Sequence, residues 1–136
     1  MTRQNGKAAI VTGASRGIGA AVAERLASDG FNLVINHAGR PEEAEAQVGR
    51  IRQSGGTAVA VRADVSNPAD IRHLFDAAEE QFGHVDVLVN NAGIMQLSTL
   101  ERLGQPADIA GVVAFLAGPD GGWINGQVLR ANGGIV

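Results

Sequence analysis

The residues with the clearest chemical potential form a glycine-rich segment near the start of the chain. Residues 12–19 read TGASRGIG, after an apolar, β-branched run and before a helical pattern. Between a strand and a helix, glycines serve where the backbone turns tightly, where a diphosphate approaches the backbone and where the helix packs closely. The first turn of the helix then offers unpaired N–H groups and the positive end of its dipole to phosphate oxygens. The segment therefore predicts a dinucleotide-binding turn.

The apolar periodicity around this turn predicts alternating strands and helices. Parallel pairing is expected because strands separated by helices of ten or more residues need long crossovers, which are right-handed. We therefore expect an α/β fold built on a doubly wound parallel sheet of the Rossmann type. The predicted strands are 8–12, 32–36, 57–61 and 85–89, and the predicted helices are 17–27, 41–54 and 68–82.

After residue 93 the alternation breaks. The next clear elements are a helix at 106–117, apolar nearly all round, and a short strand at 127–131. A helix of this kind needs cover on more than one side, from the sheet and another helix or from a second chain, so we expect a homo-oligomer that uses this part of the chain. We expect one domain over 1–136, with a cofactor-binding half at 1–100 and a C-terminal helix and strand at 101–136.

Composition excludes several classes of protein. The chain has 136 residues, of which 45% are hydrophobic and 18% charged, which is typical of a folded globular domain. The absence of cysteine excludes disulfides, a thiolate nucleophile and cysteine-ligated metals, and the net charge of −3 offers no footprint for nucleic acid. The longest apolar stretch, 110–117, is far shorter than the roughly 20 residues of a membrane span. We expect a cytoplasmic protein with small-molecule partners.

Two further motifs follow predicted strands. Asp64-Val65 comes after the third strand and Asn90-Asn91-Ala92-Gly93 after the fourth. With residues 12–19, they resemble the short-chain dehydrogenase/reductase family in its bacterial, ketoacyl-reductase-like branch. The C-terminal part resembles the same family through Arg102-x-Gly104-x-Pro106, Asp108-Ile109-Ala110, Phe115-Leu116, Asn125-Gly126-Gln127 and Gly133-Gly134.

The resemblance implies a nicotinamide dinucleotide as cofactor and hydride transfer between it and a small-molecule carbonyl or alcohol. It implies that the adenine lies against Asp64 and Val65, although Asp64 equally suits a turn or helix cap before Pro68. It places Asn90, Ala92 and Gly93 on the nicotinamide side. The residues that would hold the phosphates and the adenosine ribose are Gly13, Ser15, Arg16, Gly17, Ile18 and Gly19.

Charge near the second strand favours NADP(H) over NAD(H). NAD sites place a carboxylate after this strand to hold the ribose 2′-hydroxyl, and a carboxylate there repels a 2′-phosphate. In this sequence Asn36 takes that position. Arg16 and Arg40 are suited to pair with a phosphate, unless they are simply solvated.

The catalytic residues that the resemblance implies are absent. The family places a serine on a fifth strand and a tyrosine four residues before a lysine on the next helix, whereas this chain has no tyrosine and Lys7 as its only lysine. The sequence passes from Leu100 to Glu101 as if the middle of the family's domain had been removed. Ser98 is interpreted as a loop or cap residue, and the histidines as surface residues. The histidines are His37, His73 and His84.

Three functions remain open: an oxidoreductase whose catalytic segment is absent from this sequence, a catalytically silent dinucleotide-binding module, and an interaction protein that pairs with full-length relatives. Either an interior segment is missing from the sequence or the protein is a shortened one. In a shortened protein the fourth strand has an open edge, which natural sheets avoid. A right-handed crossover through 106–117 would bring 127–131 beside that strand, and pairing with a second chain is the alternative.

Overall fold

The structure, a computed structural model, describes residues 5–92 and 105–125. Its four parallel strands follow the order β3-β2-β1-β4, so β1 lies inside the sheet and β4 at an edge. The register pairs Ala8 with Asn32 and Asn32 with Thr57, which brings the starts of three strands level. The strands are β1 (Ala8–Val11), β2 (Asn32–His37), β3 (Thr57–Arg62) and β4 (Val87–Val89).

Local signals explain where the helices begin and end. Proline opens three of the four α-helices, where its missing N–H costs nothing. Asn67 caps one helix because its Oδ1 accepts the N–H of Ala69 at 2.9 Å, and Gly83, with φ of 83°, ends the same helix. The helices are α1 (Gly17–Ser28), α2 (Pro41–Gln53), α3 (Pro68–Phe82), α4 (Pro106–Ala117) and the 3₁₀ turn η1 (Pro119–Gly121).

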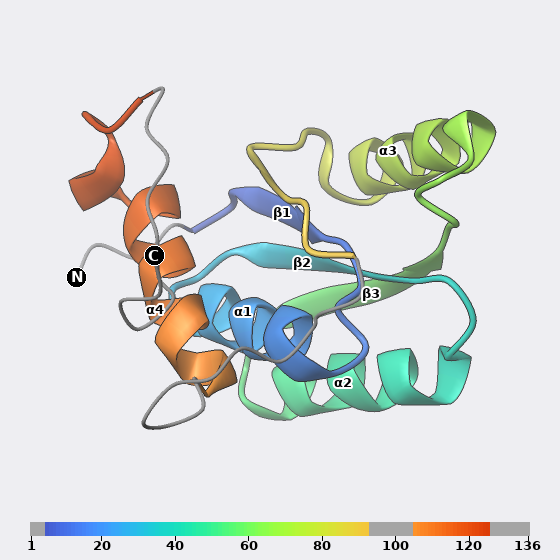
Figure 1. The fold of residues 1–136 in the computed structure, drawn as a ribbon, viewed down its shortest axis with the longest axis horizontal. Helices are drawn as coiled ribbons and strands as arrows, with labels where there is room; N and C mark the ends of the chain where they lie inside the picture. The colour runs from blue at the N-terminus through green and yellow to red at the C-terminus, as the bar shows by residue number, and fades with distance from the viewer. Residues whose placement is uncertain (1–4, 93–104, 126–136) are drawn as a thin grey trace, which may run out of the picture.

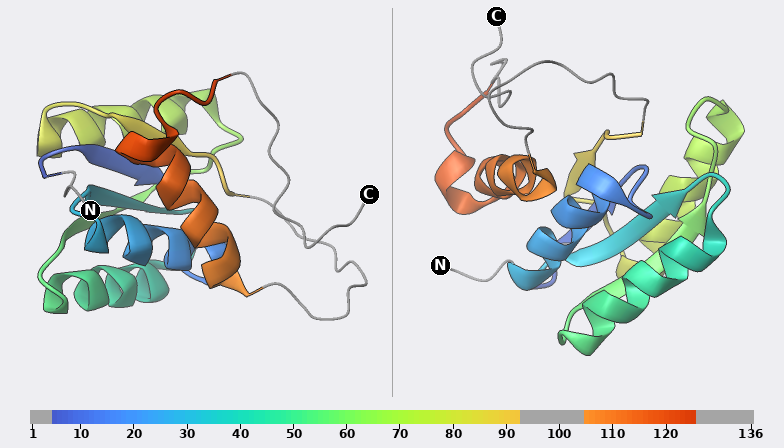
Figure 2. Two further views of the ribbon diagram at one scale, coloured as in Figure 1. Left: turned by 90° about the vertical axis from the view of Figure 1, so that its left-hand side faces the viewer. Right: turned by 60° about the horizontal axis from the view of Figure 1, so that its bottom comes forward.

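Helices cover both faces of the sheet (Figure 1). On one face, Val11 and Ile35 belong to a core shared with α1, α2 and α4. On the other face, Ile10 and Val34 pack with Leu74 of α3. Both views of Figure 2 place α4 beside α1, and these two helices are in contact. Together with the parallel strand order, the two helical layers confirm the doubly wound sheet predicted from the sequence.

The position of α4 argues against one of the two alternatives considered for the open edge of β4, the right-handed crossover through 106–117. The chain moves from β1 to β2 in one direction along the sheet with α1 on the first face, and from β3 to β4 in the opposite direction with α3 on the second face. A further strand outside β4 continues in the direction of β3 to β4, so a right-handed connection must also use the second face. Because α4 lies on the face of α1, a path from β4 through α4 to that edge is left-handed.

The element boundaries agree with the sequence expectations to within one residue, except that β4, predicted at 85–89, is observed at Val87–Val89. The strand expected at 127–131 lies outside the described residues. Within the described ranges, no helix combines the length and the apolar character that crossing a membrane requires.

Candidate functional site

The turn between β1 and α1 has the backbone that its glycines predict. Gly13 and Gly17 both have φ of 61°, in the left-handed region. A Cβ on Gly13 would lie 3.0 Å from the Cα of Ala92, and a Cβ on Gly19 would lie 2.4 Å from the carbonyl oxygen of Gly13. These two glycines therefore let the turn, the helix and the segment after β4 pack closely together.

Gly17 differs from the other two glycines because it faces open space. A Cβ built on Gly17 would meet no heavy atom within 4 Å. The residue opens α1, whose first turn carries no acidic side chain, and the N-cap residue Arg16 forms no side-chain cap. The backbone N–H groups at the start of α1 therefore have no side chain of the helix's own first turn to bind.

Thr12 ties this turn to the segment after β4. Its Oγ1 accepts the N–H groups of Asn91 and Ala92, each at 2.9 Å, and donates to the carbonyl oxygen of Val89 at 3.3 Å. The side-chain amide of Asn91 donates in return to the carbonyl oxygens of Thr12 and Gly13, at 3.0 and 3.3 Å. Neither residue is among the site residues predicted from the sequence. The structure shows that they hold its two halves together.

Asn36 has a structural role that the sequence did not predict. The residue is 2% exposed. Its Oδ1 accepts the N–H of Gly13 at 3.2 Å, and its Nδ2 donates to the carbonyl oxygens of Val61 at 3.3 Å and Ala63 at 3.1 Å. The side-chain amide therefore joins the ends of β1, β2 and β3 from within the protein.

His37 is buried, which contradicts its interpretation as a surface histidine. It is 6% exposed, and its Nδ1 is buried without a hydrogen-bond partner. The other two histidines are exposed, as expected. His84 lies just before β4, at the amino ends of the strands. Its Nε2 is 3.0 Å from the Asp86 carboxylate, which also accepts the N–H of Ala8 at 2.7 Å.

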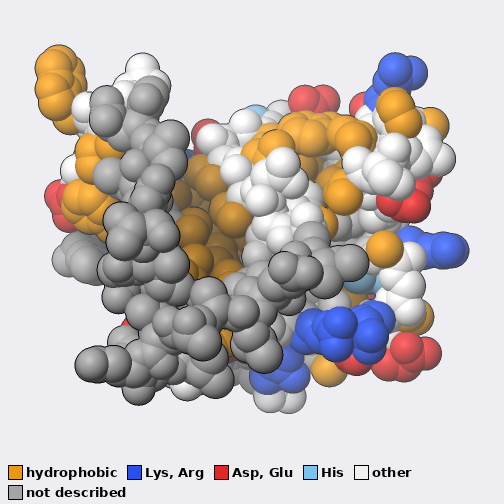
Figure 3. Space-filling model, viewed as in Figure 1, with side chains coloured by type: hydrophobic (Ala, Val, Ile, Leu, Met, Phe, Trp, Pro, Cys, Tyr) orange, Lys and Arg blue, Asp and Glu red, His pale blue; other side chains and the backbone are white. Residues whose placement is uncertain are grey.

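The two arginines proposed for a phosphate differ in their surroundings. Arg40 is paired with Glu43 in the first turn of α2 at 2.9 Å, and its side chain is 49% exposed. Arg16 is exposed, and its side chain forms no ion pair or hydrogen bond with any residue in 5–92 or 105–125. Basic side chains are visible on the right of the molecule, near the start of α1 (Figure 3).

Asp64 forms the turn that leads into α3. Its Oδ1 accepts the hydroxyl of Ser66 at 2.6 Å and the N–H of Ser66 at 2.9 Å. The hydroxyl bond and then the backbone bond hold the pKa of the Asp64 carboxyl below its usual value of 3.8. The expected turn cap is therefore present, and the contact with an adenine stays a prediction for Asp64 and for half-buried Val65.

The residues assigned to the nicotinamide side follow β4, at the carboxyl ends of the strands, where the glycine turn also lies. Asn90 is exposed and Ala92 half-buried. Gly93 and Ser98 lie outside the described residues. The remaining assigned residues are gathered in the turn itself, where Ser15 and Gly19 are buried and Ile18 is half-buried. The structure thus brings the described candidate residues to the carboxyl ends of the strands.

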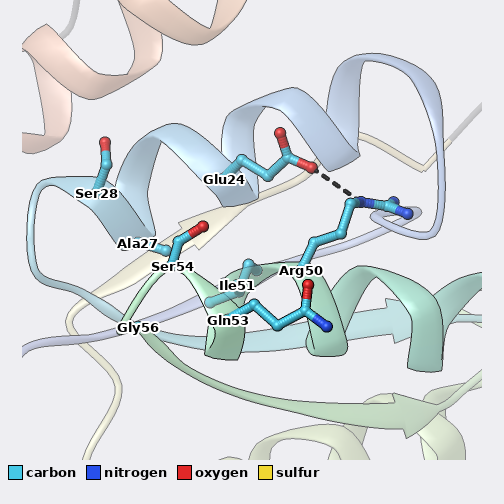
Figure 4. A pocket seen from close by; sticks show the side chains of 8 residues that line it. All are labelled: Glu24, Ala27, Ser28, Arg50, Ile51, Gln53, Ser54 and Gly56. Carbon is cyan, nitrogen blue, oxygen red and sulfur yellow. Dashed lines mark hydrogen bonds and ion pairs between the residues drawn. The ribbon is translucent and has the colours of Figure 1, made fainter.

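A pocket of about 360 Å³ lies near the amino ends of the strands, away from the glycine turn, between α1 and the end of α2 (Figure 4). Its two charged lining residues, Glu24 and Arg50, are paired at 3.3 Å. Ligands of open parallel sheets bind outside the carboxyl ends of the strands, so this pocket is the weaker candidate. No cluster of three metal-ligating side chains occurs within the described ranges.

Comparison with known proteins points to one family. The family model for short chain dehydrogenase matches residues 7–114. An uncharacterized oxidoreductase of Methylorubrum extorquens is 48% identical over 103 residues, covering 76% of this chain and 42% of that protein. A 3-oxoacyl-(acyl-carrier-protein) reductase of Staphylococcus epidermidis is 44% identical over 97 residues, covering 71% and 40%.

A solved structure of a short chain dehydrogenase from Burkholderia cenocepacia, in complex with NADP, has a TM-score of 0.65 and 41% identity over 85% of this chain and 50% of that one. The chain spans about two fifths of the length of the curated relatives it matches. The family match covers most of the sequence, including the glycine turn and the motif after β4. This chain belongs to the short-chain dehydrogenase/reductase family.

Proposed function

We propose that this chain binds a nicotinamide dinucleotide across the carboxyl ends of β1, β2 and β4. The observation that carries the proposal is the open space in front of Gly17, at the uncapped start of α1. A diphosphate placed there accepts hydrogen bonds from backbone N–H groups and benefits from the positive end of the helix dipole. Its adenosine half then extends toward the ends of β2 and β3, and its nicotinamide half toward residues 90–93.

We propose NADP(H) as the preferred form. The end of β2 and the residues that follow it, 36–40, carry no carboxylate to hold a ribose 2′-hydroxyl and repel a 2′-phosphate. Arg16 lies in the turn after β1, at the carboxyl ends of the strands. Its guanidinium has no side-chain partner among the described residues. The NADP complex of the Burkholderia cenocepacia relative supports the same choice.

The proposed reaction is hydride transfer between the nicotinamide and a small-molecule carbonyl or alcohol, as in an oxidoreductase of this family. The cofactor supplies the hydride chemistry, and this chain binds and orients it. A general acid contributes roughly 10²- to 10⁴-fold in rate, and this sequence has no tyrosine and only Lys7, which precedes β1. We therefore assign proton transfer to a segment that this sequence does not contain. Without that segment the chain is a catalytically silent cofactor-binding module. The cytoplasmic location expected from the sequence stays a prediction.

We also propose that the chain self-associates through α4 and the edge beside it. Phe115 and Leu116 of α4 are 47% and 37% exposed, and Leu88 of the edge strand is 49% exposed. Apolar side chains are visible between α4 and the sheet in Figure 3. Burial of such an apolar patch is a common driving force for association. The same patch and the open edge of β4 would also allow this chain to pair with a full-length relative.

Calorimetric titration with NADPH tests the binding proposal, using two matched glycine variants. Gly17 and Gly55 both have positive φ and open space around a built Cβ. Gly55, however, lies between α2 and β3, at the amino ends of the strands. Alanine at either position costs about 1 kcal/mol in backbone strain. We expect saturable binding by the native chain and by Gly55→Ala, with binding lost in Gly17→Ala. Equal binding by both variants would overturn the proposal.

A further inference from the structure

The outer edge of β4 is the least covered part of the sheet. Among the described residues, β4 pairs only with β1. Leu88, in the middle of β4, is 49% exposed, and its neighbour on β1 is Ile10, which packs on the second face. Paired residues of neighbouring strands point to the same side of a sheet, so Leu88 points to the second face, where α3 leaves it open. An exposed apolar edge strand is a template for a further strand.

On the first face, α4 lies at the same side of the molecule as this edge. Helix α2 contacts β3, α1 contacts β2 and β1, and α4 contacts α1 (Figures 1 and 2). The helices therefore follow the order α2, α1, α4 across the sheet, in step with the strands from β3 to β4. Val113 of α4 packs against the same core as Val87 and Val89 of β4, whereas Phe115 and Leu116 are exposed. A strand added outside β4 is thus expected to meet apolar residues of α4 on its first face.

The strand expected at 127–131 has a side-chain pattern that fits this edge. It reads QVLRA, and alternation places Leu129 on one side of the strand and Val128 and Arg130 on the other. Against β4, Leu129 belongs on the side of α4, because the opposite choice would bury the charge of Arg130 beneath an apolar helix. Val128 and Arg130 then lie on the second face, where Leu88 is exposed and a guanidinium can reach water.

The path of the chain favours a strand that comes from a second copy. In Figure 1 the strands run from left to right and the chain leaves α4 on the left, so a strand that follows α4 in the same chain runs parallel to β4. That connection is left-handed, whereas about 98% of such connections are right-handed. Residues 93–104, between β4 and α4, are too few for both a strand and a crossover of a dozen or more residues. A strand from another chain meets neither limit.

We propose that two copies of this chain exchange the strand 127–131, so that each copy adds this strand to the free edge of β4 in the other. The inference rests on the self-association proposed above and names the segment that carries it. The segment follows α4, on the same side of the molecule as the edge that receives it, as a reciprocal exchange about a two-fold axis requires. Leu129 of one copy then packs against α4 of the other, and this contact occurs twice in each dimer.

Two matched variants test which side of the strand is buried. Leu129→Glu and Arg130→Glu place the same carboxylate on opposite sides of one short strand. Leu129→Glu should raise the dimer dissociation constant at least about a hundredfold, because each dimer loses two buried leucines. Arg130→Glu stays in water and should dimerise like the native chain. Sedimentation velocity over a range of concentrations measures both constants, and circular dichroism should show native helix content in both variants, since the described core includes neither side chain.

Thiol crosslinking distinguishes exchange between copies from docking within one chain. The sequence has no cysteine, so introduced cysteines are the only thiols. A Leu88→Cys chain and an affinity-tagged Val128→Cys chain are mixed at low concentration, concentrated together and treated with a short bis-maleimide. Such a reagent joins neighbouring strands even if their register shifts by two residues. We expect covalent pairs of the two chains, and none when Ile71→Cys, on α3, replaces Leu88→Cys.

The outcomes separate the exchange from the self-association on which it rests. Dimers that resist Leu129→Glu, or mixtures without a crosslink between positions 88 and 128, overturn the exchange and leave self-association through α4 standing. A chain with both cysteines that crosslinks only within itself shows that its own strand docks there, which also overturns the exchange. A native chain that stays monomeric at every concentration overturns both proposals. Loss of the dimer in Leu129→Glu but not in Arg130→Glu, together with crosslinks between chains, supports the exchange.

Discussion

The side-chain amide of Asn91 donates hydrogen bonds to the carbonyl oxygens of Thr12 and Gly13, at 3.0 and 3.3 Å. This contact joins the segment after the edge strand to the glycine turn, so the proposed nicotinamide and diphosphate positions are fixed relative to each other. Asn91→Ala should lower the free energy of unfolding by about 1–2 kcal/mol, because two partly buried carbonyl oxygens lose their donor. Urea denaturation measures the loss. The adjacent variant Asn90→Ala, at an exposed position, should change stability by less than about 0.5 kcal/mol.

Asn36→Asp should destabilise the fold without converting the site to NAD(H). The Nδ2 of Asn36 donates to the carbonyl oxygens of Val61 and Ala63, and a carboxylate would face the same oxygens with no proton to donate. We expect a loss of about 3 kcal/mol in the free energy of unfolding at neutral pH. Asn32→Asp, the same change at the half-buried start of the strand, should cost less than about 1 kcal/mol. A stable Asn36→Asp variant with a new preference for NADH would contradict the structural role.

The strands and most helices could be predicted because their signals are local. Continuous apolar runs such as Ala8–Val11, and caps such as Asn67 and Gly83, depend on neighbours in the sequence. The face on which α4 packs could not be predicted, because its apolar residues surround the helix. Only the structure shows that Ala110 and Ala114 are buried against the core.

The candidate site also has a part that the sequence predicts and a part that it does not. The glycine turn follows from residue type and spacing, and the structure gives Gly13 and Gly17 the positive φ that such a turn needs. The burial of Asn36 and His37 depends on which side of β2 each side chain faces, and on how the neighbouring turn and strand close over it. Alternation along a strand shows that the two residues face opposite sides, but it does not show that both sides are covered at the end of β2.

Asp64 should contribute stability that depends on pH. The hydrogen bonds from Ser66 hold its carboxyl pKa below 3.8 in the folded protein, so the unfolded chain binds this proton more readily. The contribution is therefore fully present above pH 3.8 and is lost as pH falls through the lower pKa of the folded state. Comparison of the native chain with Asp64→Asn by urea denaturation should show a stability difference that is largest near neutrality and shrinks in acid. A difference that grows in acid would contradict this assignment.

Phe115→Glu should reduce self-association. Phe115 is 47% exposed on α4, so a charge there disrupts an apolar interface and leaves the isolated fold within about 0.5 kcal/mol of its original stability. Sedimentation velocity over a range of concentrations measures the change. Ile71→Glu on α3, at a position that is 38% exposed, is the matched control and should associate like the native chain. Unchanged association of Phe115→Glu would remove α4 from the proposed interface.

Backbone amide NMR during titration with NADPH tests the central claim most directly, because it locates the nucleotide on the chain. We predict that the largest shift changes occur at residues 13–19, followed by residues at the ends of β2 and β4. Two results would contradict the account: no shift changes at saturating NADPH, or changes confined to the pocket around Glu24 and Arg50 near the amino ends of the strands.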